Sequence, residues 1–587
     1  MAIVPLSKVT LVGHRADKDR VLEDLQELGC LEIVPLVPDA APLAHSSKRS
    51  REALGYLERC PQKQRAATMP TDFDPVAVEE RILDLKERTQ RLELERDALM
   101  HRIEALAPWG DFDFPPREDL AGQRLWFYVV PRNRMRELAE SGLIWEAVKR
   151  DGRNVYVIVV SENEPLGVPA PRVRTGNLSR HELERRLEAV ELELEDASLE
   201  RIRFTRWRAL LSRSLDALED RATRKHAADQ CYDSDPVFAL SAWAPTEALD
   251  ALKSYTGEHG IALEVSDPGP DDDPPTLLRN AGQREGGEDL VNFYKTPGYR
   301  SWDPSGVVLY SFAIFFAMII SDAGYGLLLA LLVTLYWKKL SGSVTGRRWR
   351  WVLLTLVVAT VGYGALVGSY FGVAPAAGSL PARLAVLDIS DTRAMMGLSV
   401  TIGVLHVMLG NLLDARRYGW SPRALPSLGW AIFVLAAYTL FLATRAGADA
   451  LRAPAIVVAG GGLALVFAFA GYGARPLGRL GKGLAALTRV TAAFGDVLSY
   501  LRLFALGLAS ASLAIAFNGM AADAREAIPS VGILLALTIL VIGHSLNLLL
   551  AVASGFIHGL RLNVIEFFNW GLPEEGPLFR PFRKKGV

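Results

Sequence analysis

Cysteine is scarce in this chain. Its 587 residues include three cysteines, Cys30, Cys60 and Cys231, all in the first half. Their spacing matches neither a zinc site nor a disulfide framework. We therefore expect reduced thiols in a cytosolic environment, and the sequence predicts neither a metal nor a cofactor.

Two further absences narrow the class of protein. No segment has the form G-x-x-x-x-G-K-[ST], so we do not expect the chain to hydrolyse ATP through a phosphate-binding loop. The N-terminal MAIVPLSKVTLVGH lacks the long apolar core of a signal peptide. The first half is therefore predicted to stay in the cytoplasm.

Acidic residues are scarce in the second half only. Residues 301-587 contain 12 Asp and Glu against 23 Lys and Arg, whereas residues 1-300 contain 54 against 42. An acidic, charge-rich half followed by an apolar, basic half is typical of a soluble domain joined to a membrane domain. We predict a cytoplasmic arm over 1-290, an approach linker over 291-305, a membrane domain over 306-570 and a basic cytoplasmic tail over 571-587.

The second half contains eight apolar segments, most of them near the roughly 20 residues that span a bilayer as a helix. The first two are short and are separated by SDAGYG around Asp322, so they form either a hairpin or one bent pair. The segments lie at about 306-320, 323-337, 351-373, 394-413, 428-444, 454-473, 491-518 and 531-568.

The loops between these segments alternate in basic content. The loops after the second, fourth and sixth segments are rich in Lys and Arg, and so is the C-terminal tail. The loops around 374-392, 445-453 and 519-529 are poor in both. Because basic loops stay in the cytoplasm, this pattern predicts eight spans with both termini cytoplasmic.

The first half predicts an arm of helices and small sheets. Residues 76-106 and 178-228 are highly charged, with apolar positions at helical spacing, which indicates two long antiparallel helices. Strand-like runs occur at 7-12, at LWFYVVP, at NVYVIVVS, at 237-243 and at 261-265, and a helical stretch is predicted from Met135 to Val148. The predicted fold is N-terminal α/β lobes joined by a long antiparallel helical coiled coil, followed by an all-α polytopic membrane domain of eight transmembrane helices, the last two long and tilted. A generic coiled coil would explain the charged helices equally well.

Two arginines lie inside apolar helices near the C-terminus. Arg502 stands in SYLRLFALGLASASLAIAF and Arg561 in GFIHGLRLNVIEFF. An arginine at the bilayer centre costs roughly 2.5 to 3.5 kcal/mol, so each must face protein, water or a counter-charge. Both therefore predict an ion pathway. For Arg561 the alternative is snorkelling to the interface, which suits Arg502 less well because apolar residues flank it on both sides.

Polar residues accompany both arginines at helical spacing. A polar stripe on an apolar helix cannot face lipid, so it must face a partner or a wet cavity. Asp322 and His406 are isolated, and we expect packing or capping roles for them rather than proton transfer. The stripe of the last helix comprises His544, Asn547, Ala551, Ser554, His558 and Arg561, and that of the preceding helix comprises Asp496, Ser499 and Arg502.

Several motifs together make the chain recognisable. They are IVPLSKVTLVG, FALSAWAP, PTLLRN, FYKTPGYRSWDPS, SDAGYG, GALVGSYFG, SYLRLFALGLA and FIHGLRLNVIEFF. On these the chain resembles subunit I of the prokaryotic V/A-type rotary ATPases, the counterpart of eukaryotic V-ATPase subunit a, over nearly its whole length. The two arginine motifs in this order are the most specific part of the resemblance.

The resemblance implies a stator in the prokaryotic plasma membrane. Its expected partners are a ring of proteolipid subunits with buried carboxylates, peripheral stalk subunits, a central-stalk ring adaptor, the soluble ATPase head and membrane lipid, with no nucleic acid. Arg502 and Arg561 would face the ring, where a nearby cation favours an ionised carboxylate and a guanidinium stays charged at physiological pH. The ion is a proton or sodium, and coupling runs to ATP hydrolysis or synthesis.

The resemblance also implies roles for the neighbouring polar residues. His558 would orient the ring carboxylate or relay protons. Ser554, Asn547 and His544 would line one half-channel. Glu566 and Asp496 are candidates for the cytoplasmic half-channel, with surface solvation and a helix-end charge as the alternatives. Ser499 is a further candidate for lining a half-channel. Ala551 stands where eukaryotic relatives place a glutamate, so their channel chemistry does not transfer directly.

Two other functions compete with the stator. A polytopic secondary ion transporter with a regulatory arm would predict internal repeats and broken midplane helices, and we find no repeat. A membrane-anchored scaffold would not need two intramembrane arginines. The stator explains both the arginines and the long acidic arm.

Overall fold

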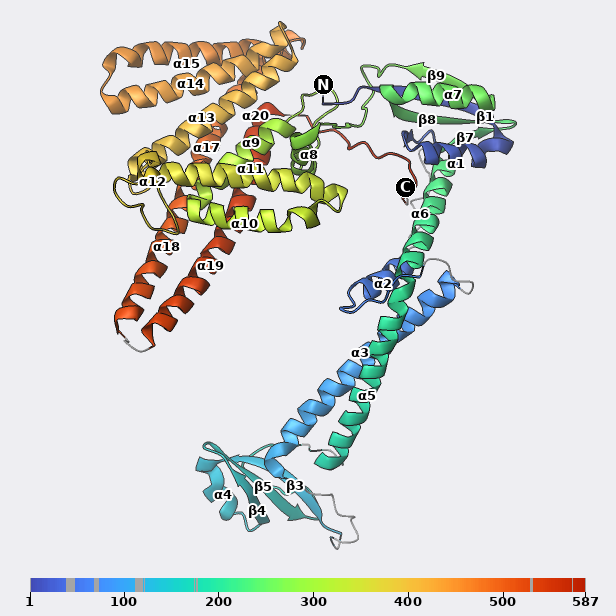
Figure 1. The fold of residues 1–587 in the computed structure, drawn as a ribbon, viewed down its shortest axis with the longest axis vertical. Coiled ribbons are helices and arrows are strands. Elements are labelled where there is room, and N and C mark those ends of the chain that lie inside the picture. The colour runs from blue at the N-terminus through green and yellow to red at the C-terminus, as the bar shows by residue number, and fades with distance from the viewer. Residues whose placement is uncertain are drawn as a thin grey trace. The chain divides into compact units, whose positions relative to one another are not determined.

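The computed structural model describes residues 2–37, 48–67, 73–110, 120, 122–173, 175, 178–527, 531–572 and 574–585 (Figure 1). Its internal contacts divide the chain into two compact units. Unit 1 comprises Met1–Gly13, Cys30–Val34 and Ala239–Pro581, and unit 2 comprises His14–Gly29, Pro35–Phe238 and Phe582–Val587. Both units are therefore discontinuous along the chain.

Unit 2 contains a four-stranded antiparallel sheet in the order β4-β5-β3-β6. Alternate residues of β5, Val155, Val157 and Val159, are buried on one face, as the period of two predicts. The strand predictions at LWFYVVP and NVYVIVVS are confirmed. The strands are β3 (Arg124–Pro131), β4 (Ile144–Arg150), β5 (Asn154–Ser161) and β6 (Arg172–Val173).

The helix predicted from Met135 to Val148 is largely wrong. Helix α4 covers only Met135–Ala139, and the chain then turns at Gly142, whose φ of 68° favours glycine. From Ile144 onward the backbone pairs with β5 as strand β4. Sheet pairing outweighs the helical spacing of the apolar residues here.

The charged helices of unit 2 run antiparallel. Arg88 pairs with Glu193 at 3.3 Å, and Glu95 pairs with Arg186 at 2.8 Å, so seven residues forward along one helix correspond to seven backward along the other. The predicted stretch 178-228 is interrupted by a 3₁₀ turn at Thr205–Trp207. A regular supercoil remains a prediction. The helices are α1 (Lys18–Leu28), α2 (Lys48–Glu58), α3 (Pro75–Leu106), α5 (Arg180–Phe204) and α6 (Arg208–Gln230), followed by the short strand β7 (Tyr232–Ser234).

Unit 1 begins with a second sheet in the order β2-β8-β1-β9. The strands predicted at 7-12, 237-243 and 261-265 are confirmed. The elements are β1 (Leu6–His14), β2 (Glu32–Val34), β8 (Val237–Pro245), helix α7 (Leu249–His259) and β9 (Ala262–Ser266).

The rest of unit 1 is helical, as predicted. Among the described residues, seven helical stretches are long and apolar enough to cross a membrane, and α9 is a shorter apolar helix of 16 residues. The figure of eight spans therefore stays a prediction. The helices are α8 (Glu285–Asn292), α9 (Ser305–Ile320), α10 (Ala323–Leu340), α11 (Val344–Val367), α12 (Leu380–Leu384), α13 (Thr392–Arg417), α14 (Leu425–Ala446), α15 (Asp449–Phe469), α16 (Pro476–Leu487), α17 (Val490–Ser499), α18 (Leu501–Ala527), α19 (Gly532–Arg561), the π-helical segment η8 (Leu562–Phe567) and α20 (Phe568–Gly571).

Helix α9 forms the core of the helical part. It packs against α11, α18 and α19, and most of its side chains are buried, including Phe312, Phe315 and Ile319. An apolar helix surrounded by other helices need not be long enough to meet water on both sides. Its enclosed position is consistent with its length of 16 residues, which is shorter than the other apolar helices.

Asp322 and His406 have the structural roles expected of them. The Asp322 carboxylate accepts hydrogen bonds from backbone N–H of Tyr325 (3.0 Å), Phe371 (2.9 Å) and Gly372 (2.9 Å), so it caps α10 and fixes the loop after α11. The His406 ring stacks on Phe567, with ring centroids 4.2 Å apart.

Candidate functional site

The two arginines lie on adjacent helices that form a hairpin. Helices α18 and α19 pack along their length (Figure 1). Arg502 is the second residue of α18, directly after the break that separates α17 from α18, and Arg561 is the last residue of α19. Both ends therefore lie on the same side of the hairpin.

A single carboxylate connects the two arginines. Arg502 Nη2 donates a hydrogen bond to Ser499 Oγ (3.1 Å), and Ser499 Oγ donates to Glu566 Oε1 (2.6 Å). Arg561 Nε lies 3.9 Å from the same Glu566 oxygen. Glu566 is only 3% exposed, whereas the Arg561 side chain is 49% exposed. Two cations and one anion leave this cluster with a formal charge of +1.

The π-helical segment brings Glu566 to Arg561. The two residues are five apart, which in an α-helix of 3.6 residues per turn would place them about 140° apart around the axis. In a π-helix the backbone bonds run from i to i+5, so residues five apart share a face. Residues 562–567 adopt this form. The pairing of Arg561 with Glu566 follows from that local widening.

A second polar cluster lies further along α19. His544 Nδ1 and Tyr325 OH are 2.7 Å apart, and Asn547 Nδ2 donates to the same hydroxyl at 3.0 Å. His544 Nε2 lies 3.1 Å from Asn518 Oδ1, and Asn547 Nδ2 also donates to the backbone oxygen of Ser510 at 2.9 Å. Asn547 and Arg561 are 14 residues apart on the helix, a rise of about 21 Å. The predicted residues thus form two separate groups.

The remaining predicted residues lie between or beside these groups. Among the described residues, Ser554 makes no side-chain hydrogen bond, and His558 Nδ1 is buried without a partner. Ala551 is buried within the helical core. Asp496 does not join Glu566: its Oδ2 accepts hydrogen bonds from Trp570 Nε1 (2.7 Å) and Asn569 Nδ2 (3.2 Å), which attach α17 to α20.

Sequence reasoning missed Tyr325 as a member of the second cluster. The signal was the SDAGYG motif, which places this tyrosine three residues after Asp322. The hydrogen bond from Tyr325 N to Asp322 Oδ1 anchors its backbone, and the hydroxyl then reaches α19. The capping aspartate and the polar stripe are thereby connected through one residue.

The surface around the arginines is apolar. Exposed aliphatic side chains lie four residues from each arginine along the chain: Leu498 near Arg502, and Ile557 and Ile565 near Arg561. The Arg561 side chain is half exposed within this region. A charged group on an apolar surface of this kind is costly against lipid. In a membrane the surface therefore requires a polar or charged partner at this level.

No family model matches the chain. Its curated relatives include V-type ATP synthase subunit I of Chlamydia trachomatis, 32% identical over 61% of this chain and 63% of the relative. V-type ATP synthase subunit I of Borreliella burgdorferi is 24% identical over 99% of both chains. A-type ATP synthase subunit I of Methanocaldococcus jannaschii is 28% identical over 68% of this chain and 63% of the relative. The chain thus spans slightly less than two thirds of the length of the Chlamydia relative.

One solved structure is also similar. The crystal structure of the cytoplasmic N-terminal domain of subunit I, homolog of subunit a, of V-ATPase matches 44% of this chain and 99% of its own, at 18% identity and a TM-score of 0.24. The chain is thus similar to V- and A-type ATP synthase subunit I proteins, and for two of these relatives the similarity extends over 99% of this chain.

Proposed function

We propose that this chain is the membrane stator subunit of a V/A-type rotary ATPase or ATP synthase. It forms ion half-channels against a rotating ring and couples proton or sodium translocation to ATP hydrolysis or synthesis. The observation that carries the proposal is the pair Arg502 and Arg561, tied to one buried carboxylate at an exposed apolar surface of α18 and α19. The names of its relatives support the same assignment.

The charge of the cluster suits a passing carboxylate. Glu566 neutralises only one of the two guanidinium groups, so a net positive charge remains at the surface. A ring carboxylate that arrives from lipid would be more stable in its ionised form beside this positive charge, and it would therefore release its ion. Because a guanidinium stays protonated at any physiological pH, the site keeps this effect throughout the cycle.

Glu566 and Ser499 act as positioning residues in this scheme. A long arginine side chain carries about 2 kcal/mol of rotamer entropy, and bonding to a fixed partner removes that freedom before the ring carboxylate arrives. Glu566 is buried, and its position is fixed by η8. The two arginines are therefore held within reach of one oxygen atom instead of extending separately toward the interface.

The two polar groups along α19 serve as parts of separate half-channels. The group of His544, Asn547 and Tyr325 lines one half-channel, with Ser554 and His558 between it and the arginines. Ser499 and Glu566 line the entrance of the other. The fixed cations between them block a continuous leak of protons, since a hydrated cation or proton would meet a positive charge at Arg502 and Arg561.

The remainder of the chain fits an anchored stator. Residues 1-290 form the cytoplasmic arm that contacts peripheral stalk subunits, and 306-570 form an eight-helix membrane domain with both termini cytoplasmic. The ATPase head and the ring adaptor complete the complex. The subunit itself binds no nucleotide and has no catalytic residue.

The test is ATP-driven ion pumping by membrane vesicles that carry the intact complex with Arg502→Ala. We expect pumping to fall to background while the complex stays assembled, because the ring carboxylate loses its counter-charge. Arg525→Ala is the matched control, since Arg525 lies on the same helix, is exposed and makes no ion pair with a described residue. Normal pumping by the Arg502→Ala complex would refute the role given to this arginine.

The competing secondary transporter is tested with the purified chain alone. Reconstituted in liposomes with an imposed ion gradient, a secondary transporter would move ions without any ATPase subunit. We expect no transport above that of empty liposomes. Gradient-driven transport that survives Arg502→Ala would favour the transporter.

A further inference from the structure

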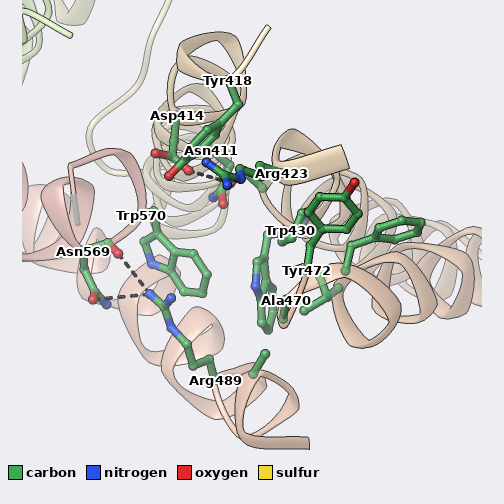
Figure 2. Close-up of a pocket in the computed structure, with 15 residues that line it drawn as sticks. Asn411, Asp414, Tyr418, Arg423, Trp430, Ala470, Tyr472, Arg489, Asn569 and Trp570 are labelled. Carbon is green, nitrogen blue, oxygen red and sulfur yellow. Dashed lines mark hydrogen bonds between the residues drawn. The ribbon is translucent and has the colours of Figure 1, made fainter. Parts of the chain in front are cut away.

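A polar cavity lies at the C-terminal end of α13 and the N-terminal ends of α14 and α17. It has a volume of about 360 Å³, within the range of roughly 300–1,000 Å³ typical of small-molecule pockets. Figure 2 shows Asp414, Arg423, Arg489, Trp430 and Trp570 among the side chains around it. None of these residues belongs to the arginine cluster of the proposed ion path.

Asp414 provides the negative charge of the cavity. It is 94% buried, and its Oδ2 accepts a hydrogen bond of 2.6 Å from Ser427. Its other oxygen, Oδ1, is buried and has no hydrogen-bond partner among the described residues. A buried carboxylate oxygen without a donor is costly, so the cavity has a site for a hydrogen-bond donor, preferably a cation.

Arg489 and Arg423 provide the positive charges. Arg489 Nη2 donates to the backbone oxygen of Asn569 at 2.9 Å, and its guanidinium lies 4.4 Å from the Trp570 ring centroid (Figure 2). Arg423 is exposed at the rim. Within the described part of the chain, neither arginine forms an ion pair with a carboxylate at 4.0 Å or less. Both are therefore available to an anion such as a phosphate.

An apolar pocket of about 550 Å³ lies on the next turns of the same helices. On α14 the lining passes from Trp430 in the polar cavity to Phe433 and Val434 in the apolar pocket, and on α17 Val490 directly follows Arg489. A free phosphate or metabolite would leave this apolar pocket empty. A molecule with a charged head and an aliphatic tail would fill both.

We propose that the polar cavity and the apolar pocket together bind one phospholipid with an ethanolamine headgroup. The phosphate lies between Arg489 and Arg423, the ammonium donates to Asp414 Oδ1, and an acyl chain enters the apolar pocket. This arrangement requires only that α13, α14 and α17 lie in the membrane, and it does not depend on ion transport.

The unpaired carboxylate oxygen selects the ethanolamine headgroup. A primary ammonium can donate a hydrogen bond to Asp414, whereas the quaternary ammonium of choline has no N–H to donate. A glycerol headgroup has no ammonium, so it offers no charged hydrogen bond to Asp414 Oδ1. The cavity is also lined by Trp430 and Trp570, and tryptophan is enriched at the level of lipid headgroups.

The test measures lipid binding by the full chain in mild detergent with native mass spectrometry. The probes are phosphatidylethanolamine, phosphatidylcholine and phosphatidylglycerol with identical acyl chains. We expect one phosphatidylethanolamine per chain, bound about tenfold more tightly than the other two, the factor that one additional charged hydrogen bond supplies. Equal affinity for the three lipids, or a preference for phosphatidylcholine, would overturn the proposal.

Three variants and one control separate the contacts. Asp414→Asn should abolish the preference for phosphatidylethanolamine. Arg423→Gln should weaken the binding of all three lipids. Ala437→Phe should fill the apolar pocket and weaken the binding of the three lipids equally. Lys482→Gln, exposed on α16 and outside the cavity, should change nothing. If Asp414→Asn fails to fold, Arg423→Gln, a change at an exposed residue, still tests whether lipid binds in this cavity. Wild-type lipid binding by Arg423→Gln and Ala437→Phe would refute the site.

Discussion

Ser499 and Glu566 are joined by a hydrogen bond of 2.6 Å between the last residue of α17 and the π-helical segment after α19. The same serine oxygen accepts a hydrogen bond from Arg502. Through this one hydroxyl, the position of the buried carboxylate constrains the Arg502 side chain on α18. Replacing Ser499 tests whether this constraint affects ion pumping.

Ser499→Ala should lower ATP-driven ion pumping by roughly five- to tenfold without loss of assembly. The variant removes both hydrogen bonds of the hydroxyl and leaves every charge in place. The bond that orients Arg502 contributes about 1 to 1.5 kcal/mol. Pumping rates of vesicles with equal amounts of complex give the measurement. Thr439→Ala, which removes a hydroxyl that bonds only its own helix, should pump normally.

Glu566→Gln provides the contrasting change at the other end of the same bond. Its amide oxygen can still accept from Ser499, but the negative charge is gone. If orientation alone matters, this variant should pump better than Ser499→Ala; if compensation of the arginines matters, it should pump worse. Equal, unimpaired pumping by both variants would contradict a positioning role for this pair.

Gly364→Ala should destabilise the helical part of unit 1 by about 1–3 kcal/mol. A Cβ at Gly364 would overlap the backbone of Asp322 and Ala323, where α11 crosses the start of α10. Gly362→Ala on the same helix meets no atom within 4 Å and should be neutral or slightly stabilising. Thermal unfolding of both variants in detergent measures the difference, and equal transitions would mean that the close crossing does not exist.

Asp322→Asn should lower stability by about 2 kcal/mol without changing the transport rate per assembled complex. The carboxylate accepts from backbone N–H groups and from Ser369 Oγ (2.6 Å), and an amide NH₂ would face some of these donors. Asp388→Asn, in an exposed loop, serves as the control. Unchanged stability with lost transport would instead place Asp322 in the ion path.

Cys231 should resist alkylation in the folded chain. Burial raises the pKa of its thiol to about 11, so the reactive thiolate is a minor species at pH 8. Between pH 8 and pH 10 its labelling rate with iodoacetamide should rise about tenfold per unit, since the thiolate fraction rises by that factor below the pKa. Denaturation in urea is the control and should give fast labelling at pH 8; equally fast labelling of the native chain would contradict the burial.

The sequence indicates the site in part, and the reasons differ from residue to residue. Arg502 and Arg561 stand out because charge is rare and costly in apolar helices. Tyr325 does not, because an aromatic residue in an apolar run is consistent with packing against lipid or protein. Likewise, hydropathy cannot tell that α9 is enclosed by other helices, since an enclosed and a lipid-facing helix are equally apolar.

Strand β4 and the partner of Arg561 were missed because a regular period was assumed. Residues from Met135 to Val148 have apolar positions that fit a helix, and only pairing with β5 decides for a strand. Glu566 lies on a different face from Arg561 when positions are counted at 3.6 residues per turn. Counting residues at a fixed period of 3.6 cannot reveal a π-helical segment or a strand, because the count assumes a regular α-helix.

The π-helical segment also sets the angular phase of everything that follows it. A π-bulge amounts to one residue inserted into an α-helix, and each residue turns an α-helix by about 100°. Deleting Ile565, an exposed residue of the segment, would return it to the α-form and rotate Trp570 away from Asp496. The one additional residue therefore sets the rotation of the chain after α19. It allows Glu566 to contact Arg561 while Trp570, four residues later, still bonds Asp496 on α17.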